Sequence, residues 1–399
     1  MNISIYTITS PLHDQKTIDE TSRYFLDELN ISFTSLKHTV YDYGTSCLDL
    51  IYIRTGGTEG IFKSLLPTLL EKSSQPFYLL TSGKSNSLAA SMEILSFLRQ
   101  NNLQGEILHG EPAYISYRIN ILAKVNEARK QLRDCNLGVI GKPSDWLISS
   151  AVDYQTIKEK LGINLIDIPI EKLIELVKNT QAIEKENWTQ HATSEQVRKS
   201  IAGANAIYLA LKKIIEEYNL QGLTIRCFDL LPTLHNTGCL ALAQLNAEGI
   251  VAGCEGDIPA MLSMKIAHAL TGKTGFQANP ATINPTTGEI LFAHCTIPFN
   301  MIDRYELLTH FESGIGVGIR GYMKEGPVTI FKVSGKLDRY FLEEGTLIEC
   351  QDKPNLCRTQ QLIQLSPEST QYFLTNPIGN HHIVIPSHCK ALLQQFLQT

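Results

Sequence analysis

The sequence lacks long hydrophobic runs, an excess of basic charge and paired cysteine motifs. No apolar stretch reaches the roughly 18 residues that a membrane-spanning helix needs. Lysine and arginine total 35 residues against 40 aspartates and glutamates, which gives a net charge of −5. The chain has no basic stripe, so neither nucleic acid nor an anionic membrane is an expected partner.

Cysteine usage and the start of the chain both indicate the cytoplasm. The nine cysteines are an odd number, and none of them forms a C-x-x-C pair. Most stand in apolar, strand-like runs, so we interpret them as buried thiols of a reducing cytosol. The first residues, MNISIYTITSPLHDQ, lack the charged and apolar regions of a signal peptide. We therefore expect a cytoplasmic protein.

Nucleotide-binding and hydrolase motifs are also missing. The sequence contains no G-x-x-x-x-G-K-[ST], G-x-S-x-G or H-E-x-x-H motif. Residues 316–321 match G-x-G-x-x-G, but the dinucleotide fingerprint requires a helix after its glycines. The residues that follow, YMKEGPVTIFKV, are strand-like. A nicotinamide-dependent dehydrogenase is therefore disfavoured.

The 399 residues divide into three regions that differ in the pattern of their predicted strands and helices. Residues 1–135 alternate continuous apolar strands with helical segments, which is typical of a doubly wound parallel sheet. Residues 136–245 repeat this pattern, with Ser144 or Asp145 as a candidate helix cap. Residues 246–399 are dominated by short β-rich runs with turn signals between them. We predict two doubly wound α/β domains followed by an antiparallel β-barrel-like domain.

Two acids and a pair of histidines stand at the ends of predicted strands. Asp229 follows an apolar strand in IRCFDLLPT, and Glu255 lies where a strand turns through EGD into a helix. His381 and His382 stand at the start of a late strand. Two carboxylates in one apolar cleft would repel each other, and a divalent cation would relieve that repulsion. Acids with one imidazole favour Mn²⁺ or Mg²⁺ over metals that prefer soft ligands.

Each candidate also has a structural alternative. An acid after a strand is often a helix cap, which is the interpretation that we favour for Asp257. Asp229 fits a structural hydrogen-bond acceptor equally well, and a histidine pair at a strand end is more often structural than metal-binding. His294, in LFAHCTIP, suits either the same cleft or a buried structural position. Arg358, in LCRTQ, suits either a sugar hydroxyl or carboxylate partner, or an exposed surface.

Several segments, in order along the chain, resemble the L-fucose isomerase-like family of fucose and arabinose isomerases and their shorter relatives. They are IGKPSDWLISSAVDY, CFDLLPT, GCLALAQLNAEGIVAGCEGDIPAML, LFAHCTIP and GNHH. The loops RTGGTEG and SNSLAASMEIL are consistent with this family. The resemblance implies two α/β domains, a β-rich third domain, and a metal bound by two acids and a late histidine.

The resemblance assigns roles to individual residues of this chain. Asp229 would be the first metal-binding acid, although fucose and arabinose isomerases have Glu there, and Glu255 would be the second. The imidazole would come from His381 or His382, and the double histidine of the arabinose isomerases favours the second. The implied cofactor is Mn²⁺, with Mg²⁺ as the alternative.

Members of this family assemble as oligomers, in which the first domain of one subunit helps to close the sugar pocket of another. We therefore expect a homo-oligomer, a trimer or a hexamer, with a small sugar as its ligand. The residues expected to bind the sugar are Arg54, Gly57, Thr58, Ser85, Asn86, Trp146, His294 and Arg358.

The implied reaction is aldose–ketose isomerisation of a monosaccharide through a cis-enediol. A metal would stabilise the developing enediolate, while Asp229 and Glu255 transfer the protons at C2 and O1. Two other classes stay open. One is a non-catalytic sugar-binding or regulatory protein on the same scaffold, and the other is a metal-assisted sugar epimerase or aldolase.

Overall fold

The computed structural model describes residues 2–37, 39, 43–72 and 76–398. The chain divides into two compact units, one made of residues 1–127 with 395–399 and the other of residues 128–394. Each unit has hydrophobic clusters of its own.

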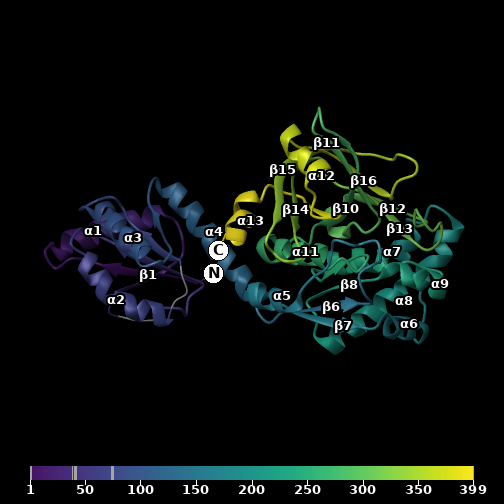
Figure 1. The fold of residues 1–399 in the computed structure, drawn as a ribbon, viewed down its shortest axis with the longest axis horizontal. Coiled ribbons are helices and arrows are strands. Elements are labelled where there is room, and N and C mark those ends of the chain that lie inside the picture. Colours follow the sequence, from purple (N-terminus) through teal and green to yellow (C-terminus); the bar gives the residue numbers. More distant parts are fainter. Residues whose placement is uncertain (1, 38, 40–42, 73–75, 399) are drawn as a thin grey trace. The chain divides into compact units, whose positions relative to one another are not determined.

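The first unit is built on a five-stranded parallel sheet (Figure 1). Its strands, in spatial order, are β2 (Thr34–Lys37), β1 (Ile3–Ile8), β3 (Leu48–Ile53), β4 (Phe77–Leu80) and β5 (Gly105–Leu108). Its helices are α1 (Gln15–Glu28), α2 (Glu59–Lys72), α3 (Ser87–Gln100) and most of α4 (Pro112–Leu132). The strand order reverses between β1 and β3, as in other doubly wound sheets.

Strand β3 shows why both faces of this sheet are covered by helices. Leu50 and Tyr52 belong to a core that also contains residues of α1 and α4. Ile51 and Ile53 point to the other face and belong to a core with residues of α2 and α3. A strand buried on both faces reads as a continuous apolar run, which residues 50–53 show.

The second unit begins with a four-stranded parallel sheet in the order β7-β6-β8-β9. Its strands are β6 (Asn136–Ile140), β7 (Asn164–Ile168), β8 (Gly222–Ile225) and β9 (Val251–Gly253). The helices of this region are α5 (Tyr154–Leu161), α6 (Ile170–Lys178), α7 (Glu186–Thr189), α8 (Glu195–Tyr218), α9 (Leu231–Leu234) and α10 (Cys239–Ala247). Helices α6, α8 and α10 share one hydrophobic core with the sheet.

A closed antiparallel barrel follows in the same unit (Figure 1). Its strands, in spatial order, are β10 (Phe276–Asn284), β11 (Glu289–His294), β16 (Thr359–Gln364), β15 (Tyr340–Cys350), β14 (Gly326–Val333) and β17 (His382–Ile385). The remaining elements are the pair β12 (Arg304–Leu308) and β13 (Gly318–Tyr322), and the helices α11 (Ile258–Thr271), α12 (Pro367–Thr375) and α13 (Lys390–Gln398). The largely buried helix α11 contacts β8 and β9 of the parallel sheet and β14 and β17 of the barrel.

The predicted fold class is confirmed, because parallel α/β sheets precede an antiparallel barrel. Two local expectations are wrong. No helix begins at Ser144 or Asp145, because Ser144 donates its backbone N–H to the Glu255 carbonyl at 2.9 Å and the segment stays a loop. Asp229 does not end a strand but lies in a 3₁₀ turn, Cys227–Leu230, which the Asp229 N–H closes onto the Arg226 carbonyl.

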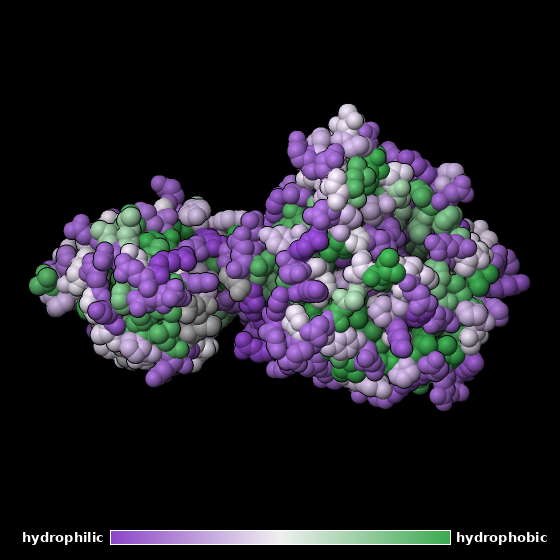
Figure 2. Space-filling model, viewed as in Figure 1, coloured by the Kyte–Doolittle hydropathy of each residue, from purple (hydrophilic) through white to green (hydrophobic). Residues whose placement is uncertain are grey.

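Hydrophilic side chains dominate the face of the molecule shown in Figure 2, and hydrophobic ones form small groups on it. The large side chains of Trp188 and Phe292 are instead fully buried. Among the described residues, no helix combines the length and the apolar character that crossing a bilayer requires.

Candidate metal centre

Glu255 lies in a tight turn between β9 and α11. Its backbone φ is +62° and that of Gly256 is +69°, so two successive residues adopt the left-handed conformation. This conformation is uncommon for a residue other than glycine, and it is found more often at functional sites. Two backbone hydrogen bonds hold the turn, from Gly256 N to Ile225 O at 2.8 Å and from Asp257 N to Cys254 O at 3.2 Å.

Gly256 allows this turn to pack directly against the loop after β6. A Cβ atom at this position would lie 2.6 Å from the Lys142 carbonyl oxygen and 2.8 Å from Pro143 Cα. Both neighbours are backbone atoms, so a larger residue could be accommodated only by moving the loop. The EGD sequence therefore fixes the direction in which the Glu255 side chain points.

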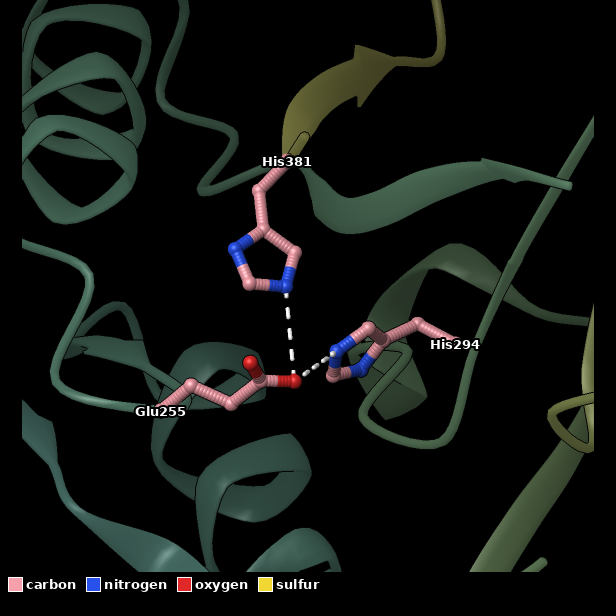
Figure 3. A group of neighbouring side chains, drawn as sticks. All are labelled: Glu255, His294 and His381. Atoms are coloured by element: carbon pink, nitrogen blue, oxygen red, sulfur yellow. Dashed lines mark ion pairs between the residues drawn. The ribbon is translucent and has the colours of Figure 1, made fainter. Parts of the chain in front are cut away.

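Glu255, His294 and His381 point toward one another from three different elements (Figure 3). Glu255 comes from the turn after β9, His294 ends β11, and His381 directly precedes β17. The Nε2 atoms of both histidines lie 3.5 Å from Glu255 Oε1. One ligand atom from each residue lies within 4.8 Å of those of the other two, and all three side chains are buried.

The second nitrogen of each imidazole has a partner of its own. His381 Nδ1 lies 2.8 Å from Asp257 Oδ2, and His294 Nδ1 lies 3.0 Å from Thr296 Oγ1. Asp257 also accepts a hydrogen bond from Ala260 N at 2.8 Å, so it caps α11 as we expect from the sequence. Each imidazole is thereby held with Nε2 directed at Glu255, which is the arrangement typical of metal-binding histidines.

The three side chains of this group shift one another's pKa values. Burial alone would raise the pKa of Glu255, but His381 and His294 hold it well below the usual range. Burial alone would lower the pKa of His381, but Glu255 and Asp257 raise it to about 9. His294 has a lowered pKa, mainly because it is buried. The Glu255 carboxylate and the His381 imidazolium therefore compensate each other without a metal, and a cation would bind by displacing the second proton of His381.

Trp146 contacts the remaining oxygen of Glu255. Its indole Nε1–H donates to Glu255 Oε2 at 2.7 Å, although the residue is 51% exposed. The indole packs edge-on against Phe228, with ring centroids 4.9 Å apart. The loop after β6 thus places an aromatic ring at the solvent side of the centre.

Asp229 lies outside this group in the structure. Its carboxylate is 3.0 Å from Arg226 Nε, and the guanidinium of Arg226 also lies 2.7 Å from Asp145 Oδ2. Asp229 and Arg226 line an open cavity of about 730 Å³ at the carboxyl ends of β6, β7 and β8. Asp229, the other acid predicted from the sequence, therefore faces a cleft beside the loop that carries Trp146.

The structure also places His382 away from the group. Its Nε2 lies 3.0 Å from the Tyr372 hydroxyl, and its Nδ1 lies 3.1 Å from the Asn380 carbonyl oxygen. Burial lowers the pKa of His382 to about 3, so its imidazole is neutral. Of the two adjacent histidines, His381 therefore belongs to the group.

Arg358 lies in the same unit and is tied to the loop after β12. Its Nε donates to the Thr309 carbonyl at 2.8 Å. The neighbouring residue His310 was not singled out from the sequence. Burial lowers the pKa of His310 to about 4, and the charges of His294 and Arg358 add to this effect, so these side chains face one region.

The other residues expected to bind a sugar belong to the first unit, at the carboxyl ends of β3 and β4. The buried Arg54 donates to Ser22 Oγ at 2.9 Å and pairs with Asp19, and the buried Thr58 donates to the Thr55 carbonyl. The backbones of Gly57, Ser85 and Asn86 are left-handed, with φ of +75°, +53° and +59°. Their role in sugar binding stays a prediction.

No model of a known protein family matches this chain. The chain is similar, however, to curated proteins named sulfoquinovose isomerase. The protein of Alkalicoccus urumqiensis is 26% identical over 275 residues, which cover 64% of this chain and 61% of that protein. That of Priestia megaterium is 26% identical over 275 residues, with 64% and 60% covered. That of Clostridium sp. is 24% identical over 279 residues, again with 64% and 60% covered. The matches thus span about three-fifths of the length of these relatives.

Proposed function

We propose that this chain is a metal-dependent aldose–ketose isomerase of the fucose and arabinose isomerase-like group, acting on a monosaccharide. The observation that carries the proposal is the buried group of Glu255, His294 and His381. The similarity to proteins named sulfoquinovose isomerase supports the same class of reaction.

The three side chains suit a divalent metal ion. His381 Nε2 is buried, faces Glu255, and has no hydrogen-bond partner among the residues that the structure describes. A buried polar atom without a partner is costly, and a cation bound by His381 and Glu255 would satisfy both. When bound, the metal would supply Lewis-acid stabilisation of the negative charge that develops on the sugar oxygens.

The donor set bears on the identity of the metal. We expect two acids and one imidazole from the sequence, whereas the structure groups one acid with two imidazoles. Imidazole favours transition metals, whereas Mg²⁺ strongly prefers oxygen ligands. This donor set makes Mg²⁺ the poorer fit, and we retain Mn²⁺ as the proposed ion because the resemblance to fucose and arabinose isomerases implies it.

Isomerisation moves one proton between neighbouring carbons of the open-chain sugar. We propose that Glu255 and Asp229 provide the acidic groups for the proton transfers, each worth about 10²- to 10⁴-fold in rate. Trp146 holds Glu255 Oε2, which leaves Oε1 directed at the histidines. Asp229 would take part by exchanging its contact with Arg226 for the substrate. The half-exposed indole of Trp146 offers an apolar face for the sugar ring atoms.

Sulfoquinovose, a sulfonated hexose, is the first substrate to test because the relatives carry it in their names. Deoxyhexoses and pentoses are the alternatives, since a few pocket groups worth about 1–3 kcal/mol each separate such sugars. We further propose a cytoplasmic homo-oligomer, a trimer or a hexamer. In it, the loops of the first unit around Arg54 and Asn86 would complete the sugar pocket of a neighbouring subunit.

A non-catalytic sugar-binding protein is the second candidate function. The position of Asp229, which pairs with Arg226 outside the metal-binding group, favours it. The deciding experiment is a screen of aldoses and ketoses with the Mn²⁺-loaded protein, read by chromatography. Interconversion of one aldose and its ketose supports the isomerase. Sugar binding without conversion, with metal bound, would support the second candidate instead.

A further inference from the structure

Asp257 carries two hydrogen bonds and an ion pair in the interior of the second unit. Its Oδ1 accepts from the Ala260 backbone N–H at 2.8 Å, and its Oδ2 lies 2.8 Å from His381 Nδ1. Lys332 Nζ, from β14, lies 3.5 Å from Oδ1 and 3.4 Å from Oδ2. The side chains of Asp257 and His381 are 0% exposed and that of Lys332 is 1% exposed.

We propose that Asp257 and Lys332 are positioning residues that fix His381 in the tautomer whose Nε2 can bind a metal. This inference rests on the proposed metal site, but it concerns two residues outside the group of ligands. Neither residue contacts the reacting atoms in this arrangement, and both act through His381.

The tautomer follows from what Asp257 can offer. An ionised carboxylate only accepts hydrogen bonds, so His381 Nδ1 must carry the proton that it shares with Oδ2. Nε2 is then the nitrogen that can give up a proton to a metal ion, and it is the atom that faces Glu255 Oε1 at 3.5 Å. The same proton on Nε2 would instead block the ligand position.

Both oxygens of Asp257 must therefore remain acceptors at the same time. One satisfies the first turn of α11 and the other satisfies His381. A neutral carboxyl group would turn one of these oxygens into a donor. Lys332 lies almost equally far from both oxygens, so its charge stabilises the ionised form without displacing either hydrogen bond.

The buried ion pair of Asp257 and Lys332 is not expected to add much to the stability of the fold. Two charges taken out of water pay a desolvation cost that their attraction often fails to recover, and apolar replacements are frequently neutral or stabilising. Helix caps elsewhere in the chain, such as Asp14 and Asp153, are exposed and lack a buried lysine. Asp257, the cap that also contacts His381, pairs with the buried Lys332, which agrees with a role in holding the imidazole.

Replacing Asp257 with asparagine separates the capping of α11 from the hydrogen bond with His381. The asparagine side chain of D257N has one acceptor, which the Ala260 N–H requires, so its amide N–H₂ would face His381 Nδ1. His381 would then accept at Nδ1 and carry its proton on Nε2. We expect D257N to weaken Mn²⁺ binding by about 10- to 100-fold, the range typical of partners that orient a ligand. Calorimetric titration of the full-length metal-free protein with Mn²⁺ alone measures this, with no sugar and no turnover.

The matched control is Asp153→Asn. Asp153 caps α5 by accepting from Thr156 N at 3.1 Å, and no hydrogen bond or ion pair joins it to a histidine that the structure describes. Asn and Asp cap helices about equally well, so D153N should keep both the melting temperature and the Mn²⁺ affinity. Wild-type affinity in D257N as well as in D153N would overturn the proposal.

A double-mutant cycle tests whether Lys332 acts through Asp257. K332M should lower the Mn²⁺ affinity because the Asp257 carboxylate then loses the cation that holds it between its two hydrogen bonds. The double variant D257N/K332M should bind Mn²⁺ no more weakly than D257N, and it removes the uncompensated charge that could unfold either single variant. Additive losses would show that Lys332 acts independently and would refute its part of the proposal.

A spectroscopic measurement on the metal-free protein does not depend on the proposed reaction, and its wild-type part does not require D257N or K332M to fold. At a pH high enough for the His381 ring to carry a single proton, the wild-type protein labelled with ¹⁵N-histidine should show that proton on Nδ1. D257N should show the Nε2–H tautomer, assigned by loss of the signal in H381Q. A wild-type His381 that lacks a proton on Nδ1 would overturn the proposal. Failure of the wild type to bind Mn²⁺ would instead count against the proposed function.

Discussion

Trp146 and Glu255 are joined by an indole N–H to carboxylate hydrogen bond of 2.7 Å, across 109 positions of the sequence. It connects a half-exposed aromatic residue in the loop after β6 to the one acid of the metal-binding group. The fluorescence of Trp146 should therefore respond to whatever binds at Glu255.

We expect Mn²⁺ titration of the protein to change its tryptophan emission through Trp146. W146F should abolish most of this change and lower the Mn²⁺ affinity by about 10- to 100-fold, because a hydrogen bond to a charged group is worth roughly 1.5–3 kcal/mol. The control is W188F, since Trp188 is buried in the barrel-side core and does not contact the site. An unchanged emission response in W146F would contradict the assignment.

Gly256 should be the least replaceable glycine near the centre. G256A places a methyl group 2.6 Å from the Lys142 carbonyl oxygen in a left-handed residue. We expect a loss of about 1 kcal/mol from the backbone conformation and a further ~1–3 kcal/mol from the clash, with impaired metal binding.

The control is G272A, whose φ of +73° is similar but whose Cβ would meet nothing within 4 Å. It should lose only about 1 kcal/mol and keep its Mn²⁺ affinity. Denaturant unfolding and Mn²⁺ titration of both variants test this difference. Equal effects of the two substitutions would mean that contact with the Lys142 loop does not position Glu255.

The side-chain amide of Asn246 links the end of α10 to β9. The buried side chain donates to the carbonyls of Leu242 and Ala252 and accepts from Ala252 N at 2.9 Å. N246A would leave the backbone N–H and C=O of Ala252 without these partners, at a cost of about 1–3 kcal/mol for each unsatisfied group.

The exposed Asn101 gives a matched comparison, because its amide donates to the Phe97 carbonyl at 2.8 Å in contact with solvent. N101A should change the free energy of unfolding by less than about 0.5 kcal/mol. A small effect of N246A in the same urea titration would show that water replaces the lost partners.

The fold and part of the site could be predicted because they depend on local pattern. Continuous apolar runs predict buried parallel strands, and EGD with Pro259 two positions later predicts the turn with Glu255 and the cap at Asp257. The choice between His381 and His382 could not be made in this way. It depends on which of two adjacent side chains points inward at the start of β17, and strand neighbours point in opposite directions.

The sequence alone does not decide the role of His294 for a related reason. Its sequence context, at the end of an apolar strand, is equally suitable for a structural histidine. The register of β10 against both neighbours, with Asn279 opposite Ala293 of β11 and Ala278 opposite His382 of β17, brings His294 to the same end of the barrel as His381. Asp229 was favoured by the family pattern, but nothing in the sequence indicates that Arg226 would pair with it.

The ligand set can be decided by comparing four single variants. In the structure His294 belongs to the group and Asp229 does not, whereas the resemblance to fucose and arabinose isomerases implies Asp229 as a ligand. We expect E255Q, H294Q and H381Q each to lose Mn²⁺ binding by at least about 100-fold, because each removes a ligand from a site of three. D229N should retain the metal and lose turnover, since the Asp229 carboxylate is proposed for proton transfer.

Calorimetry with Mn²⁺ alone and a turnover assay on the loaded protein separate these effects. If D229N lost the metal while H294Q kept it, the cation would be held by Asp229 and Glu255 as in the family pattern. The arrangement of His294 described above would then not be the one that binds the metal.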